Sequence, residues 1–252
     1  MRLRHPLRLG ITTLAVTTAL GAASVIPAMA ASSPVPSPSS SASSASCSGS
    51  AASVLACIKQ RAATAISDRE SALQKMTTDV NGSAGITSSD KSTLLGQIQA
   101  DESGLTALNA TIQGDTTVAQ ARADAQTIVT GYRVYLLEEP KVHLVIAADT
   151  EGAVESRISS VLPALQTAIN DSTASAANKA KAQTAFNDCS SQLAAAQSAS
   201  SGIASEVIDL LPSGYPGNQP TLVSARQSAK TARQDLGTCR TDINTIRSAL
   251  GI

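Results

Sequence analysis

The segment Thr221–Leu250, TLVSARQSAKTARQDLGTCRTDINTIRSAL, decides the fold of this chain. Its apolar and small residues recur with alternating steps of three and four. This spacing keeps them on one face of a helix and is the pattern of a coiled coil. We therefore predict one long helix that packs against a second helix along this face. The positions of the seam are Leu222, Ala225, Ala229, Ala232, Leu236, Cys239, Ile243, Ile246 and Leu250.

A second seam of the same period precedes this helix. The two are separated by the segment 212–220, PSGYPGNQP, which no helix could cross because it holds three prolines. The seams are mirror images about this loop, so that Leu193 falls opposite Leu236 in an antiparallel pair. We therefore predict a helical hairpin over 174–250. The second seam consists of Phe186, Cys189, Leu193, Ala196, Ser200, Ile203, Val207 and Leu210.

The same register predicts how the four cysteines pair. Cys189 and Cys239 face each other across the hairpin, and a disulfide between them would close a loop of about fifty residues. In the chain-entropy description such a bond adds on the order of 4 kcal/mol to stability. Cys47 and Cys57 are then left to pair with each other. Four cysteines allow three connectivities, and only this one agrees with the seam.

An earlier part of the chain predicts a second antiparallel hairpin, over 51–114. Its turn is the segment 81–85, NGSAG, and its two halves again carry apolar residues at heptad spacing. Arg69 and Asp101 make this seam less apolar than the other. The two halves are Leu55, Ile58, Ala62, Ala65, Arg69, Ala72 and Met76, and then Leu94, Ile98, Leu105, Leu108 and Ile112.

A third helical unit covers 116–170 and contains two prolines. The heptad pattern runs to Pro140, where we expect a kink or a break because proline removes a backbone donor and clashes with the preceding turn. By the same reasoning we expect a second irregularity at Pro163. One kinked helix and two antiparallel helices both fit this segment. Residues 47–252 are thus expected to form an all-α domain, an elongated antiparallel helical bundle with coiled-coil-like hairpins and about five helices.

The amino terminus has the features of a cleavable secretory signal over residues 1–30. Arg2, Arg4 and Arg8 precede an apolar stretch, and Ala28-Met-Ala30 supplies a small-x-small cleavage site. Residues 31–46 are almost entirely Ser, Ala and Pro, which predicts a disordered linker. We expect a secreted, extracellular protein, either free or associated with the cell wall, with no stable membrane span once the signal is removed.

The charge of the mature chain argues against a nucleic-acid partner. The precursor carries 19 basic and 19 acidic residues, and cleavage would remove three arginines and no acid. A nucleic-acid binder needs a basic face, whereas the mature chain is net negative. The chain also lacks Trp, and aromatic residues make up only 2% of it, so stacking on bases is not expected.

The candidate contact residues lie on both sides of Pro140. Tyr132, Arg133 and Tyr135 precede it, and His143, the one histidine left after signal cleavage, follows it. These four side chains could contact a ligand or a partner at the kink. The simpler interpretation is that the tyrosines fill the core and that the histidine lies on a helix flank.

The sequence predicts no catalytic, metal or cofactor site. A single histidine excludes multi-histidine zinc sites, and the cysteines lack Cys-x-x-Cys spacing. Glu138 and Glu139 are adjacent and cannot share a helix face, so they make a poor acid–base pair. An enzyme would have to use His143 with Asp149 or Glu139, which we consider the weakest option.

Three stretches carry a resemblance to a known group of proteins. They are Gly104–Asn109 (GLTALN), Arg122–Tyr135 (RADAQTIVTGYRVY) and Pro140–Asp149 (PKVHLVIAAD). Together they resemble secreted, Ala-rich helical proteins of actinobacteria, over roughly 88–170 and most specifically at Tyr132–Asp149. The resemblance implies an actinobacterial origin, export and a helical fold. It implies no catalytic residues.

Two functional hypotheses follow, and a third is weaker. The first is a non-enzymatic helical-bundle protein of the cell envelope or secretome that acts through protein or surface contacts. The alternative is a small-molecule carrier or chaperone with an apolar pocket near Tyr132, Tyr135, His143 and Ile146, at the Pro140 kink. The identity of the partner and the oligomeric state are left open.

Overall fold

The computed structural model describes residues 47–252, so the predicted signal (1–30) and linker (31–46) lie outside the described part of the chain. Helix accounts for 85% of the described residues, and no strand occurs among them. The predicted all-α fold is confirmed. Five helices have 25 to 33 residues each: α1 (Ala51–Gly82), α2 (Ser88–Gly114), α4 (Glu139–Asp171), α5 (Ala176–Ser200) and α7 (Gln219–Leu250).

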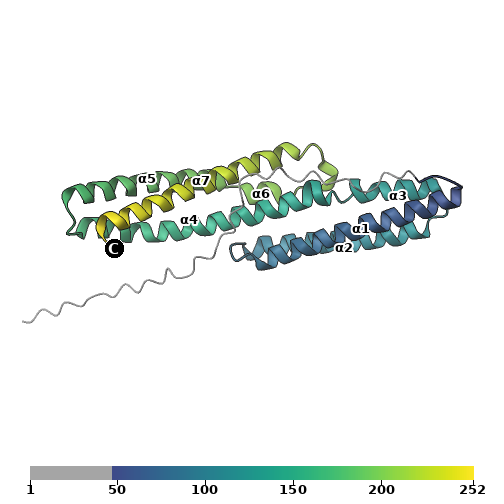
Figure 1. The fold of residues 1–252 in the computed structure, drawn as a ribbon, viewed down its shortest axis with the longest axis horizontal. Helices are drawn as coiled ribbons and strands as arrows, with labels where there is room; N and C mark the ends of the chain where they lie inside the picture. Colours follow the sequence, from purple (N-terminus) through teal and green to yellow (C-terminus); the bar gives the residue numbers. More distant parts are fainter. Residues whose placement is uncertain (1–46) are drawn as a thin grey trace, which may run out of the picture. The chain divides into compact units, whose positions relative to one another are not determined.

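Four shorter elements connect the long helices (Figure 1). They are α3 (Val118–Thr130), a π-helix η1 (Val134–Glu138), α6 (Ile203–Val207) and a 3₁₀ turn η2 (Pro212–Gly214).

Helices α1 and α2 form the predicted first hairpin. Ala62 and Leu105, which the heptad register places opposite each other, are both buried. Each helix begins at a hydroxyl cap, where Ser50 Oγ accepts from the backbone N–H of Ser53 and Thr87 Oγ1 from that of Asp90. Such caps satisfy backbone donors that have no partner within the helix. Helix α3 packs against both α1 and α2 and completes a three-helix group.

The predicted break at Pro140 is wrong in position. The helix ends earlier, at Gly131, and the chain passes through a left-handed conformation at Arg133 (φ 49°) before the π-helix begins. Pro140 instead occupies the first turn of α4, where a missing N–H is tolerated because that donor would have no helical partner. Helices α3 and α4 follow one another in the same direction and do not pack side by side (Figure 1).

The irregularity expected at Pro163 is also absent, because α4 runs through it from Glu139 to Asp171. Proline removes the hydrogen bond to the carbonyl four residues earlier, which belongs to Ser159. Ser159 is exposed, so water can take the place of the missing donor.

Helices α5 and α7 form the predicted second hairpin, and α4 packs along both. Leu193 and Leu236 lie in one buried cluster together with the cysteines of the seam. The helix expected to continue to Leu210 ends instead at Ser200. Gly202 adopts a left-handed conformation (φ 87°) that is easy for glycine, and the short helix α6 follows.

We call the region where the group of α1, α2 and α3 meets the group of α4, α5 and α7 the junction. It comprises η1, the first turns of α4, the segment 203–211, and the part of α2 that they contact. Ile203 and Val207 of α6 are buried in the same core cluster as Leu94 and Ile98 of α2. This packing explains why the chain departs from a continuous helix after Ser200: α6 fills the junction core, which a straight α5 would leave open.

Candidate functional site

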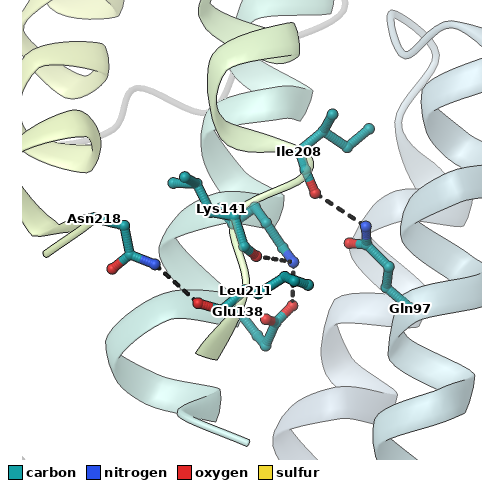
Figure 2. A network of polar contacts seen from close by, with 7 residues as sticks. Gln97, Glu138, Lys141, Ile208, Leu211 and Asn218 are labelled. Atoms are coloured by element: carbon teal, nitrogen blue, oxygen red, sulfur yellow. Dashed lines mark hydrogen bonds and ion pairs between the residues drawn. The ribbon is translucent and has the colours of Figure 1, made fainter. Parts of the chain in front are cut away.

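A buried ion pair lies at the junction. Lys141 Nζ is 2.7 Å from Glu138 Oε2, and the two side chains are only 2% and 3% exposed. The same Nζ donates to the backbone carbonyl of Leu210 at 3.3 Å (Figure 2). A buried charge needs both a counter-charge and hydrogen bonds, and Lys141 has both.

Two further side chains hold the carbonyls that follow α6. Gln97 Nε2 of α2 donates to the carbonyl of Ile208 at 3.0 Å, and Asn218 Nδ2 donates to that of Leu211 at 3.0 Å (Figure 2). The last carbonyls of a helix have no partner within it. Donors from three different elements therefore fasten the segment 208–211, with Lys141 at its centre.

Asp101 of α2 adds a second carboxylate to this neighbourhood. Burial raises the pKa of Asp101 to about 6; the negative charge of Glu138 raises it further, and Lys141 acts in the opposite direction. Burial also raises the pKa of Glu138, against the favourable charge and hydrogen bond of Lys141. Two acids with raised pKa, Asp101 and Glu138, thus lie around the buried cation of Lys141.

Tyr132 turns toward α2. A Cβ at Gly104 would lie 2.5 Å from Tyr132 Oη, so the tyrosine ring occupies the space that this glycine leaves free. Burial raises the pKa of Tyr132, and the charge of Asp101 raises it further. Tyr132 is therefore a packing residue of the α2 interface.

Arg133 turns toward the loop before α7. Its guanidinium lies over the ring of Tyr215, 4.7 Å from the centroid, in cation–π geometry. Its Nε is buried and has no hydrogen-bond partner. The contact joins the α3–η1 connection to the 212–218 loop.

The side chains of Tyr135 and His143 contact neither α2 nor the 212–218 loop in the way that Tyr132 and Arg133 do. Tyr135 is exposed, and Arg69 of α1 lies 5.3 Å from its ring centroid. His143 is half-buried on α4 and makes no hydrogen bond or ion pair within residues 47–252. Tyr132, Arg133 and Tyr135 thus contact α2, the 212–218 loop and α1 in turn, and the structure does not bring the predicted contact residues together.

Both predicted disulfides are present, Cys47–Cys57 and Cys189–Cys239. Cys189 and Cys239 are fully buried between α5 and α7, whereas Cys47 and Cys57 are half-buried at the start of α1. The antiparallel register of the seam is thereby confirmed by a covalent bond.

An open cavity of about 450 Å³ lies between α4 and the segment 200–209, at the beginning of α2. Its wall combines acidic and hydroxyl side chains with small and apolar ones, and Pro140 is not among the residues that line it. Asp149 Oδ2 accepts from the N–H of Thr87 at 2.8 Å. Burial raises the pKa of Asp149; the hydrogen bond from Thr87 opposes this change, and the nearby charge of Asp90 reinforces it. The wall includes Asp90, Ala148, Asp149, Ser200, Ser205 and Asp209.

Further along α4, Glu151 lies at the contact with α7. Its Oε1 is 3.1 Å from Arg233 Nη2, while its Oε2 is buried without a partner. Burial raises the pKa of Glu151 to about 7, which Arg233 opposes and Glu155 reinforces. Glu155 in turn accepts a hydrogen bond from Ser200 Oγ at 2.8 Å, so this part of α4 links both helices of the second hairpin.

The sequence-based interpretation missed the Glu138–Lys141 pair. The sequence pattern could have indicated this ion pair, because residues three apart lie on the same face of a helix and the pair lies inside an apolar stretch. The polar residues in the seam of the first hairpin were a second indication of a buried charge, since Asp101 lies close to Glu138 and Lys141.

Within residues 47–252, no group of three or more His, Cys, Asp or Glu side chains could hold a metal ion. None of the described helices is both long and apolar enough to cross a membrane. Comparison of the chain with protein-family models, curated proteins and solved structures gives no match.

Proposed function

We propose that this chain is a secreted, non-enzymatic helical-bundle protein of the cell envelope or secretome, of actinobacterial type, that acts through protein or surface contacts. The two disulfides support export, because such bonds persist in oxidising compartments. The signal-like features of residues 1–30 support it independently.

Exposed apolar side chains at the junction and at the adjoining end of α3 carry the proposal. Val129 and Leu136 are 45% and 47% exposed on one segment, and Leu211 is 61% exposed beside the 212–218 loop. The stacking of Arg133 on Tyr215 brings these two segments together. Single exposed apolar residues are ordinary, but several on adjoining segments are typical of an interaction surface.

The rigidity of the junction supports the same interpretation. The Glu138–Lys141 pair and the bond from Lys141 to Leu210 fasten the backbone directly beside Leu211. A preorganised surface binds without the entropic cost of ordering its own loops. The polar groups of the junction are thus engaged in holding a surface in place.

Photo-crosslinking on intact secreting cells tests the proposal. A photoreactive residue at position 136 should capture a discrete envelope protein or surface polymer. The same residue at position 161 should not, because Val161 has a similar exposure of 40% but lies in the middle of α4, away from the junction. Absence of any product from position 136, or identical products from both positions, would refute the proposal.

A carrier function is the second candidate, and the 450 Å³ cavity is the observation that favours it. Native mass spectrometry of the secreted protein decides between the two. Extra mass that is lost on denaturation would support a carrier and identify its ligand class. A clean protein mass would leave the contact function as the better explanation.

A further inference from the structure

The exposed side of α7 carries a row of cations at heptad spacing. Four arginines are each seven residues apart, and a lysine lies in the same row. Each arginine directly follows a buried residue of the α7 seam, so all four flank the seam on the same side. All five cations are exposed. This basic row consists of Arg226, Lys230, Arg233, Arg240 and Arg247.

The helix holds the row straight and rigid. Helix α7 is uninterrupted from Gln219 to Leu250, lies along α5 (Figure 1), and is fastened to it by the Cys189–Cys239 disulfide. Seven residues of helix rise by about 10.5 Å, so the arginines repeat at that distance over about 32 Å.

Most cations of the basic row form no ion pair within the described part of the chain. Among residues 47–252, only Arg233 of the row forms an ion pair, and its partner is Glu151. Arg247 lies in the last turn of α7, where a cation favours the helix dipole. Arg226 and Lys230 are four residues apart and repel each other, so this end of the row does not stabilise α7.

The acids of α7 are kept on the other flank of the seam. Asp235 and Asp242 are half-buried, and Asp242 lies close enough to Asp188 of α5 for the second carboxylate to raise its pKa beyond the effect of burial. No acid of α7 therefore interrupts the row, and the carboxylate that pairs with it, Glu151, belongs to α4. At its centre, Gly237 has open space above it, with no atom within 4 Å of the position of a Cβ.

We propose that the basic row binds an acidic amphipathic helix of a partner protein whose carboxylates also repeat every seven residues. Such a helix has the same repeat of about 10.5 Å as the row, so each guanidinium can meet one carboxylate. Arginine forms paired hydrogen bonds with carboxylates, and charges beside a heptad seam select partner helices.

Two features of the row complement a helix rather than a flat or flexible anion. Gly237 allows close approach of a backbone at the centre, and Val223, which is exposed three residues before Arg226, adds an apolar contact at one end. An anionic membrane surface has mobile charges with no fixed spacing for the row to match. The inference rests on the proposed function, since it names a class of partner.

The test uses the secreted protein and two synthetic five-heptad helical peptides of equal composition. One peptide has glutamate at heptad spacing, and the other has its glutamates moved out of that register. Calorimetry at low salt should show binding of the first peptide and about tenfold weaker binding of the second. Arg226→Gln with Arg240→Gln should weaken the first complex about tenfold.

The matched control is Arg122→Gln with Lys181→Gln, which removes the same charge from exposed positions on α3 and α5. This control should leave binding unchanged. A charge-reversed protein, Arg226→Glu with Arg240→Glu, should recover binding to a peptide with lysine in place of glutamate, which confirms that the fold is intact.

Three results would overturn the inference. They are no binding of the heptad peptide, equal loss in the control variant, and binding only to phosphatidylglycerol vesicles or polyphosphate. Crosslinking at position 136 could capture a partner whose binding is unchanged by the arginine substitutions. That result would support the proposed function and refute this inference alone.

Discussion

Lys141 Nζ lies 2.7 Å from Glu138 Oε2 in the interior of the junction, and the two residues are three apart, with Glu139 and Pro140 between them. The pair anchors the carbonyl of Leu210 and so connects the beginning of α4 to the segment after α6. Glu138 and Lys141 are neighbours in the sequence, whereas Leu210 is 69 residues away from Lys141, so one side chain makes both a local and a long-range contact.

Replacement of Lys141 by Met should lower the free energy of unfolding by about 3–5 kcal/mol, because Glu138 would remain buried without a counter-charge. The double variant Glu138→Gln with Lys141→Met should recover much of that loss. Urea unfolding measures both. Lys75→Met is the control: its ion pair with Asp79 is on the surface, so the change should be below about 1 kcal/mol. Equal losses for Lys75 and Lys141 would contradict the role of the buried pair.

Stability should fall as the pH rises from about 4 to about 7. The pKa of Asp101 is raised from 3.8 to about 6 and that of Glu151 from 4.5 to about 7, so the folded chain binds these protons more tightly than the unfolded chain does. The stability that the bound protons contribute is complete below the unfolded-state pKa values and is lost as the pH rises to the folded-state values.

Urea unfolding at a series of pH values checks this trend. Asp101→Asn should flatten the lower part of the profile, and Asp68→Asn, at an exposed position of α1, should leave it unchanged. A stability that rises over this range would show that the two acids are not the groups that dominate it.

The two disulfides should differ in their reaction with a mild reductant. Cys47 and Cys57 are half-buried, whereas Cys189 and Cys239 are fully buried. Under native conditions, alkylation after brief reduction should therefore label the first pair, and the second pair should react only when the chain unfolds. Peptide mass spectrometry reads the result. Equal labelling of all four cysteines would mean that the α5–α7 seam opens readily.

Gly104→Ala should destabilise the protein by about 1–3 kcal/mol, because the new Cβ would meet the ring of Tyr132. The control lies in the same helix: Gly96 has nothing within 4 Å, so Gly96→Ala should stabilise α2 by up to about 1 kcal/mol. Thermal unfolding of both variants gives the comparison. Two variants of the same sign would argue against the packing of Tyr132 on α2.

Local periodicity was sufficient to predict the two hairpins and the pairing of the cysteines. A seam of period 3.5 shows which residues share a face, and a mirrored seam shows which of them meet. The match of Leu193 with Leu236 is determined in this way by the chain itself. The basic row of α7 has the same origin, since its spacing of seven can be read directly from the sequence.

Tertiary structure determined where the helices break and which elements the predicted contact residues pack against. A proline can begin a helix or interrupt one, and only packing determines which; at Pro140 it begins α4. The end of α5 at Ser200 depends on the junction core that Ile203 and Val207 fill. Likewise, Tyr132 and Arg133 are neighbours in sequence but contact α2 and the 212–218 loop, because the left-handed backbone at Arg133 separates their directions. Periodicity describes one helix face at a time, whereas these outcomes depend on which other elements are near enough to bury it.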